Sequence, residues 1–409
     1  MNEFLTALVL GAGYNAALVA IGSALLGCAA GAAGTFIFLR KRALVSDAVA
    51  HATLPGVALA FIIMVALGGN GRDLTGVLTG SAHSAAAGRL GVGWMTGTTR
   101  LAEDAAIGAV LSVVFGFGIV LLTVIQTMSG GRQAGLESFL LGSTAGMLFN
   151  DALIITIGGA LTVAATFLLR RPMTLVAFDP DYARATGHDV ARIDMAMMIL
   201  VMAVTVIGLK VVGLILIVAL LIIPAVTARF WTERSEHVLW IASLIGATAG
   251  YVGASISATA PALPTGPIIV LVASALFVVS LLFAPARGIA AAMLRHWRFE
   301  RRVHLRQGLL SLARSEPIHD RFTLDTLRRA DLIRPDGVAT DRGRAQAAKA
   351  QRDEHRWEVA RRIHKDTSLT GRYDGLTPIE TVFTADEIDE FDRQIGSPRI
   401  VPAAGGGAQ

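Results

Sequence analysis

Long uncharged stretches, separated by segments that carry charges, dominate the first two-thirds of the chain. The clearest are Phe4–Leu39, Ala48–Leu67, Ala105–Thr127 and Ala152–Leu169. A helix needs about 20 apolar residues to cross the roughly 30 Å hydrocarbon core of a bilayer, and these stretches approach or exceed that length. The pattern therefore predicts an all-α membrane protein that crosses the bilayer several times.

Later segments predict further spans, and two of the segments leave the total open. Asp194–Arg229 carries Lys210 as its only internal charge and is long enough for two short passes, while Val238–Ala284 gives two more. Leu74–Met95 is richer in Ala, Gly and Ser, and Ser138–Phe149 suits either a short span or a re-entrant piece. We expect eight or nine transmembrane helices.

The charges separate this membrane part from a tail. Only 16% of the 409 residues are charged, against about 25% in an average soluble domain. From Arg287 to the end there are 22 basic and 18 acidic residues, which leaves 14 basic and 13 acidic for the first 286. We expect a transmembrane domain over 1–286 and a small domain over 287–409 with a disordered extreme C-terminus. Basic clusters such as Arg40–Arg42 favour the cytoplasmic side, where we also place the tail.

An acidic residue and a histidine form the densest polar cluster inside a predicted span. Asp47 and His51 are four residues apart, so on a helix both lie on one face, about one turn apart. Ionisable groups within a span usually face a partner or a pathway, and a carboxylate with an imidazole suits a first-row divalent metal. Two ligands hold a metal weakly, and a second copy of the pair across a dimer axis would supply four. A simple hydrogen-bonded pair within the bundle is the other interpretation.

The loop Phe178–His188 predicts a short helix between two spans. Asp179 suits the N-cap, Pro180 the first helical position and Gly187 the residue after the helix ends. Such a helix could dock a cytoplasmic partner or could be a plain surface helix.

Taken together, these segments resemble the permeases of the ABC-3 family, which import zinc, manganese or iron. The matching pieces occur in family order: LRKRALVSDAVAHATLPGVALAF, TTRLAEDAAIGAVLSVVFGFGIVLL, GLESFLLG, FDPDYARATG, VVGLILIVALLIIPAVTARFW and LPTGPIIVLVAS. The resemblance implies a permease dimer of two copies or paralogues, two separate ATPase subunits and an extracytoplasmic metal-binding protein. It places the transported metal at Asp47 and His51. It also implies that FDPDYARATG couples the permease to the ATPase, through Asp179, Pro180, Tyr182, Ala183 and Gly187.

The sequence itself agrees with a transport subunit that is not an enzyme. The motif G-x-x-x-x-G-K-[ST], which cradles nucleotide phosphates, does not occur in it. ATP hydrolysis is therefore expected from a separate chain. No permanently bound cofactor is expected, because the divalent metal is the cargo.

The tail resembles a second family, the winged-helix metalloregulators of the diphtheria-toxin-repressor type. The segment ADLIRPDGVATDRGRAQAAKAQRDEHRWEVA predicts a helix, a wing-like turn and a long helix, and hence a small α/β domain. The regulators' metal ligands are not matched, since His355 is followed by Glu358 at three residues rather than four, and Glu380 by Thr381. The near balance of charges gives no strong basic face, so a nucleic-acid partner is not expected. We expect a regulatory or assembly domain, with metal sensing and a purely stabilising role as alternatives.

These interpretations converge on one expected function. The chain is expected to be the permease of an ATP-driven importer for a divalent metal, with manganese favoured by the tail, in the inner membrane of a bacterium. An ion-coupled secondary metal transporter and a membrane-anchored metal-responsive transcription regulator are the alternatives. The first would transport without ATP, and the second would bind DNA through residues 300–409.

Overall fold

The computed structural model describes residues 2–41, 43–69, 74–127, 149–209, 213–260, 263–363 and 373–395. The side chains of 2–3, 43–46, 74 and 214–216 are not described. Three sequence predictions lie outside these residues: most of the segment 138–149, Lys210 and the C-terminal end after 395. The chain divides into two compact units, Met1–Ala291 and Ala292–Gln409. The predicted domain boundary at 286 is five residues before this division.

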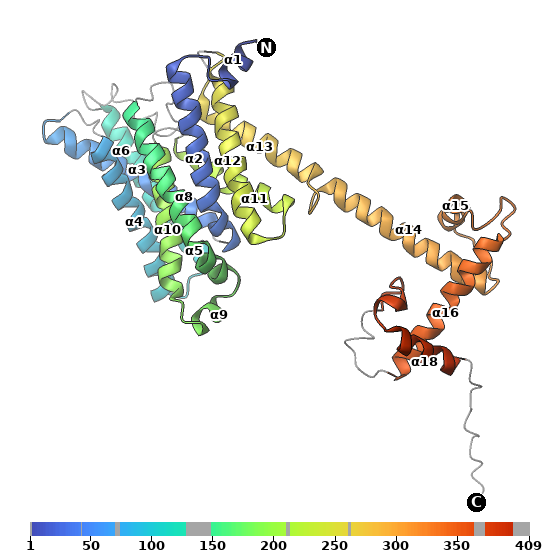
Figure 1. Cartoon of the computed structure of the whole chain (residues 1–409). Coiled ribbons are helices and arrows are strands. Elements are labelled where there is room, and N and C mark those ends of the chain that lie inside the picture. Colours follow the sequence, from blue (N-terminus) through green and yellow to red (C-terminus); the bar gives the residue numbers. More distant parts are fainter. Residues whose placement is uncertain are drawn as a thin grey trace, which may run out of the picture. The chain divides into compact units, whose positions relative to one another are not determined.

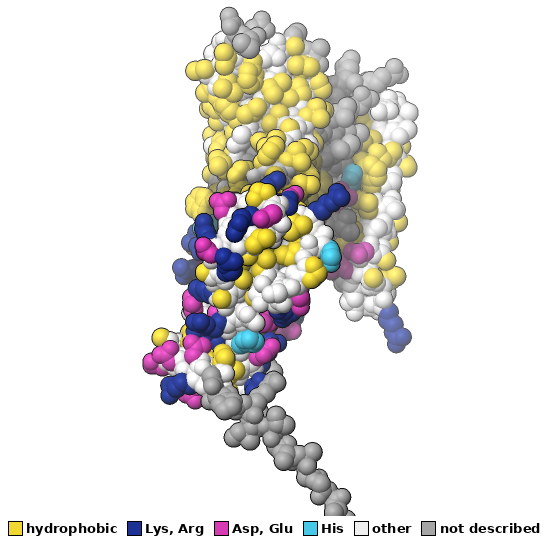
Figure 2. Space-filling model, turned by 90° about the vertical axis from the view of Figure 1, so that its right-hand side faces the viewer, with side chains coloured by type: hydrophobic (Ala, Val, Ile, Leu, Met, Phe, Trp, Pro, Cys, Tyr) yellow, Lys and Arg dark blue, Asp and Glu magenta, His cyan; other side chains and the backbone are white. Residues whose placement is uncertain are grey.

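Apolar helices make up the first unit (Figure 1). In chain order they are α1 (Asn2–Leu8), α2 (Tyr14–Leu39), α3 (Ala43–Ala66), α4 (Leu74–Thr98), α5 (Glu103–Val110), η1 (Leu111–Phe115), α6 (Gly116–Thr127), α8 (Phe149–Phe178), α9 (Pro180–Ala185), α10 (Val190–Leu209), α11 (Leu214–Trp231), α12 (Ser235–Ser257) and α13 (Thr265–Phe283). Hydrophobic side chains cover much of the visible face of this unit, as a lipid-facing bundle requires (Figure 2).

Seven helices among the described residues are long and apolar enough to cross a membrane, so the predicted count of eight or nine is corrected. Six of these are α2, α3, α8, α10, α12 and α13, and α5, η1 and α6 together form the seventh, Glu103–Thr127. The two remaining candidates fall short for different reasons. Helix α4 contains many Gly, Thr and Ser residues, and α11 offers only a shorter apolar helix, Ile217–Trp231.

Helix α2 is the centre of the first unit, and small residues bring α12 unusually close to it. Ser23, Gly27 and Gly31 recur every four residues on one face of α2. The face of α12 opposite them carries Gly250, Gly246 and Ala242. A Cβ at Gly27 would lie 2.1 Å from the carbonyl oxygen of Gly246, and one at Gly31 would lie 2.2 Å from that of Ala242. The two backbones are therefore in direct contact, which is how small residues allow membrane helices to associate.

The second unit is helical where the structure describes it. It comprises most of α14 (Ile289–Ala313), then α15 (Arg321–Arg329), α16 (Asp341–Ile363), the short η3 (Ile379–Thr381) and α18 (Ala385–Ile395). Acidic and basic side chains are mixed over its visible surface (Figure 2). Two clusters form its core. One lies around Trp357, Ile379 and Phe391, and the other around Leu327 and Ile333.

The α/β character predicted for the tail is not found in these described residues. Between α15 and α16 the structure has one isolated bridge, Ile333 to Ala339, around a turn in which Gly337 has a φ of +85°. Pro335 has no N–H to extend the ladder. Immediately after the bridge, the Thr340 hydroxyl accepts a hydrogen bond from the N–H of Gly343 at 3.0 Å, at the start of α16. The extended segment is therefore too short to form a winged hairpin.

Candidate metal pair and coupling helix

Asp47 and His51 lie on one face of α3, as their spacing predicts. The Nε2 atom of His51 is 3.3 Å from Oδ1 of Asp47, and the two side chains are 18% and 34% exposed, respectively. Divalent ions bind nitrogen and oxygen ligands at about 2.0–2.2 Å, which puts neighbouring ligands about 3.0–3.5 Å apart. The observed separation therefore lets both atoms contact one ion without a change of backbone.

The remaining nitrogen of this histidine has no hydrogen-bond partner in the described part of the chain. Nδ1 of His51 is buried there. The imidazole ring instead packs edge-on against Phe115, with ring centroids 4.6 Å apart and planes at 77°. An unpaired polar atom in an apolar surrounding is unfavourable, and such atoms in a native protein call for an explanation. The ring is thus fixed by packing, with Nε2 directed at Asp47.

A local irregularity in the neighbouring helix provides that packing. Leu111–Phe115 forms one turn of π-helix between α5 and α6, and Phe115 is its last residue. Further along α6, Gly118 approaches α3 at Pro55, where an added Cβ would lie 3.0 Å from the proline ring. Pro55 cannot donate to the carbonyl of His51 four residues earlier. π-Helical turns occur often at functional sites, and this one positions the ring of Phe115 against His51.

The predicted short helix between two spans is present as α9. Oδ1 of Asp179 accepts a hydrogen bond from the N–H of Tyr182 at 2.9 Å, and Pro180 is the first helical residue. Gly187 ends the helix with a φ of +86°. The Ala183 side chain is fully buried, whereas Tyr182 is 57% exposed. A rigid, capped helix therefore presents an aromatic side chain at the end of the bundle where α8 turns into α10 (Figure 1).

An arginine that ends α2 connects the two helices on either side of α9. Nε and Nη2 of Arg40 donate to the two carboxylate oxygens of Asp194 in α10, at 3.2 and 3.1 Å. Nη1 donates to the carbonyl of Val176 in α8 at 3.1 Å. The side chains of the ion pair are only 17% and 14% exposed. Sequence reasoning missed this contact, because Arg40 was interpreted only as a topogenic charge and Asp194 only as the start of a span.

Other polar candidates are occupied locally or lie on the surface. Nδ1 of His83 in α4 lies 2.7 Å from the carbonyl of Thr79 in its own helix. In the second unit His355 and Glu358 are exposed, and Glu380 pairs with Lys349 at 3.5 Å. A cluster of three or more His, Cys, Asp or Glu side chains that could hold a metal is not found within the described ranges. One copy of this part of the chain thus offers two ligands at the α3 pair.

A bundle of apolar helices with an acid–histidine pair inside one span and a capped helix between two others has the features of a membrane transport protein. A model of the ABC 3 transport family matches residues 14–284, and the chain belongs to this family.

Named relatives and solved structures agree with this assignment. The chain is 39% identical over 298 residues to the manganese transport system membrane protein MntC of Bacillus subtilis, covering 73% of this chain and 67% of that one. It is 36% identical to the zinc transport system membrane protein TroC of Treponema pallidum, covering 72% and 96%. The PsaBC structure from Streptococcus pneumoniae, in complex with Fab, matches with a TM-score of 0.60 at 30% identity, over 70% of this chain and 97% of that one. An inward-facing metal-chelate type ABC transporter shares the fold, with a TM-score of 0.51 at 19% identity over 68% and 97%.

Proposed function

We propose that this chain is the permease subunit of an ABC importer for a divalent transition metal, and that the metal passes Asp47 and His51. The observation that carries the proposal is the 3.3 Å separation of the two ligand atoms within a membrane helix. The family and the names of its members support transport of a metal. The alternative of an ion-coupled secondary transporter is less favoured, because family members operate with an ATPase.

The metal pair works by weak, transient ligation. One carboxylate and one imidazole are too few to trap a divalent ion, and an ion that must leave cannot be bound tightly. A second permease copy or a paralogue contributes another pair across the dimer axis. Manganese is the favoured cargo, since carboxylate ligands suit it and the relative MntC is a manganese transport protein. Zinc and iron accept the same ligands.

Helix α9 receives the motion of the ATPase at the cytoplasmic end of the bundle. Its exposed Tyr182 docks on the separate ATPase chain, and its buried Ala183 fixes it to the permease. Arg40 then transmits the displacement, because its guanidinium holds α8 on one side of α9 and α10 on the other. Asp47 follows Arg40 by seven residues and is the fifth residue of α3. Movement of α9 therefore has a short route to the metal pair.

Orientation and partners follow from the same arrangement. We infer from the basic residues near α9 that this end of the bundle faces the cytoplasm. The membrane is then the inner membrane of a bacterium. The opposite end receives metal from an extracytoplasmic binding protein. The second unit is then a cytoplasmic regulatory or assembly domain that contacts the ATPase subunits. A chain ended after residue 291 tests this role, since assembly predicts loss of co-purified ATPase and regulation predicts uptake that no longer responds to cellular metal.

Uptake by proteoliposomes tests the main proposal. The full chain is reconstituted with its ATPase and binding protein, and radioactive manganese, zinc and iron are supplied separately. Asp47→Asn and His51→Gln should each reduce ATP-dependent uptake of one metal at least about tenfold, since the first removes the charge of the carboxylate ligand and the second removes the imidazole ligand. His83→Gln is the matched control, because that histidine also lies in a helix of the first unit but faces its own backbone. Equal uptake by all three variants would refute the site, and uptake without ATP would favour the secondary transporter.

A further inference from the structure

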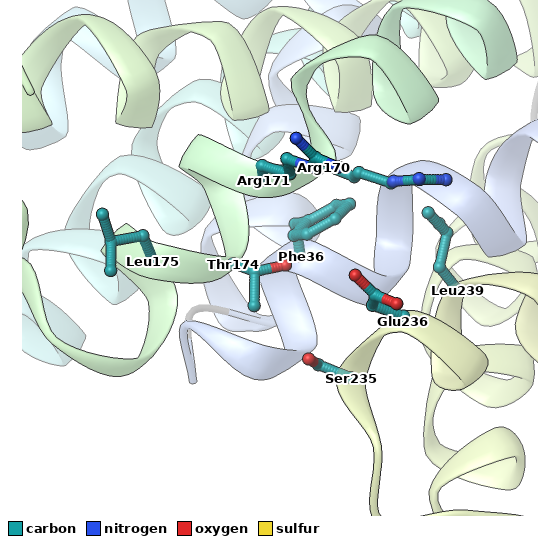
Figure 3. A pocket seen from close by; sticks show the side chains of 8 residues that line it. All are labelled: Phe36, Arg170, Arg171, Thr174, Leu175, Ser235, Glu236 and Leu239. Carbon is teal, nitrogen blue, oxygen red and sulfur yellow. The ribbon is translucent and has the colours of Figure 1, made fainter.

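We propose that a pocket between α2, α8 and α12 binds the headgroup of an anionic phospholipid. The pocket has a volume of about 250 Å³ and lies where Arg170 and Arg171 of α8 face the first turn of α12. In Figure 3 the two arginines occupy one side, the ring of Phe36 lies in the middle, and Ser235 and Glu236 occupy the other side. Since a water molecule takes up about 30 Å³ of liquid, the space suits a phosphate with its ester substituents.

The two arginines differ from three other arginines at this end of the bundle, which have carboxylate partners. Arg40 pairs with Asp194, Arg184 with Asp181 and Arg192 with Asp189. Neither Arg170 nor Arg171 has a hydrogen-bond or ion-pair partner in the part of the chain that the structure describes. Two adjacent guanidinium groups therefore face one pocket without a paired carboxylate among the described residues. Guanidinium is the side chain best suited to bind a phosphate through paired hydrogen bonds.

The opposite wall adds donors and fixes the charge of the ligand. Helix α12 begins after Arg234, whose side chain makes no capping hydrogen bond, and its first two residues, Ser235 and Glu236, line the pocket, so the positive dipole end of the helix lies at this wall. Glu236 contributes one negative charge. The pocket thus carries a net charge of about +1, which matches a phosphodiester with a single negative charge. The Glu236 carboxylate can accept a hydrogen bond from a hydroxyl of the headgroup.

The surroundings favour a lipid over a soluble phosphate. The floor is apolar, with Phe36 and Leu239 almost fully buried. One turn further along α12, Trp240 is 58% exposed and stacks on Phe167 of α8, with ring centroids 4.2 Å apart. Exposed Trp residues mark the membrane–water interface. Leu168 and Leu244 on the same two helices are 82% and 67% exposed, which provides an apolar surface for acyl chains next to the charged pocket.

Basic pockets between membrane helices on the cytoplasmic side are a known way to hold acidic headgroups. In this protein the pocket touches the central helix α2 through Phe36, four residues before Arg40. A bound headgroup would therefore bridge α8 and α12 next to the ion pair that connects α2 with α10. The lipid would act as a structural ligand that keeps these helices together.

Native mass spectrometry of the full-length chain tests the proposal. The protein is purified with an equimolar mixture of phosphatidylglycerol and phosphatidylcholine that share the same acyl chains, and the retained lipids are counted. We expect wild type to prefer phosphatidylglycerol. Arg170→Gln with Arg171→Gln should lower that preference about thirtyfold, because each basic residue near a membrane surface contributes on the order of fivefold. Glu236→Gln should raise the preference, so the proposal also predicts a gain.

The controls separate this site from general electrostatic attraction. Arg184→Gln with Arg192→Gln removes the same charge from the same end of the bundle, from residues that already have carboxylate partners, and should leave the preference unchanged. A preference that falls equally in both double variants would overturn the proposal. Displacement of the lipid by millimolar inorganic phosphate would show a site for soluble phosphate instead. In a Cys28→Ser background, a disulfide between two Ser235→Cys chains would show that a second copy covers the pocket, and would also overturn it.

Discussion

The contact between α2 and α12 gives the sharpest prediction about the fold. An alanine Cβ at position 246 would lie 2.1 Å from the carbonyl oxygen of Gly27 and 2.8 Å from its carbonyl carbon. The atoms in the way are backbone atoms, so no rotation of a side chain can relieve the overlap. The helices must separate by about 1 Å, which loosens the contacts along the whole seam that includes Gly31 and Gly250.

The cost follows from this geometry. Overpacking in a well-packed core costs about 1–3 kcal/mol and more where the structure cannot adjust, so we expect Gly246→Ala to destabilise by about 3 kcal/mol. At about 2–4 °C for each kcal/mol, the midpoint of thermal unfolding in detergent should fall by roughly 6–12 °C. Gly108→Ala in α5 is the matched control, because its Cβ would meet nothing within 4 Å. That variant should be neutral or gain up to about 1 kcal/mol of helix propensity.

A double variant adds a test of mechanism. If Gly27→Ala and Gly246→Ala act on the same seam, the first already separates the helices and the second costs less than it does alone. The measurement is the unfolding midpoint followed by circular dichroism for the two single variants and the double variant. An unfolding midpoint for Gly246→Ala within 1–2 °C of wild type, or strict additivity, would show that the backbones are not in direct contact.

Three further predictions concern the coupling end of the bundle and the second unit. Asp194→Asn should lower the amount of metal transported per ATP hydrolysed, because Arg40 loses its anionic partner. Asp189→Asn, at an exposed ion pair, is the control. The same ratio of metal to ATP in both variants would contradict the role of Arg40. Asp179→Ala should remove the N-cap of α9 at a cost of about 1 kcal/mol, so the amides of 181–183 should exchange hydrogen roughly fivefold faster. The control variant Asp181→Ala keeps the N-cap and should not show this increase. Burial raises the pKa of Asp353, so its charge opposes folding increasingly as pH rises through that pKa. Asp353→Asn should therefore slow hydrogen exchange of the α16 amides at pH 7, relative to wild type and after correction for intrinsic exchange rates. The effect should be smaller near pH 4.

Hydropathy and capping residues were sufficient to predict the parts of the fold that depend on local sequence. Uncharged stretches located the long helices, because a membrane requires apolar side chains wherever backbone groups are satisfied within a helix. Asp179, Pro180 and Gly187 predicted α9 and its two ends, since each acts on backbone groups within a few residues. The Asp47–His51 pair was likewise found from helical spacing. What these residues do in transport stays a prediction.

Contacts between distant segments could not be predicted in this way. Arg40 and Asp194 are 154 residues apart, and neither neighbourhood specifies the other. The π-helical turn that brings Phe115 to His51 has no distinct composition, because LSVVF also suits an ordinary apolar helix. The glycines of α2 permit close packing, but the sequence does not identify α12 as the partner. The prediction of an α/β tail was wrong. The segment around Pro335 and Gly337 resembles the wing of a winged-helix domain in sequence, but it forms only a single bridge between two helices.

In the function proposed above, the position of Arg40 lets one helix contribute to both stability and transport. The backbone of Arg40 caps the end of α2. Helix α2 is in direct backbone contact with α12, so the two helices should move together. The guanidinium of Arg40 lies at the α9 end of the bundle, where it hydrogen-bonds to α8 and to α10, the helices before and after α9. A displacement of α9 must either break three hydrogen bonds of a largely buried cation or carry α2 along. Breaking a charge pair that is largely shielded from water costs several kcal/mol, so carrying α2 is the easier response. The chain then passes into α3, and Asp47 is the first ionisable residue of that helix that this motion reaches.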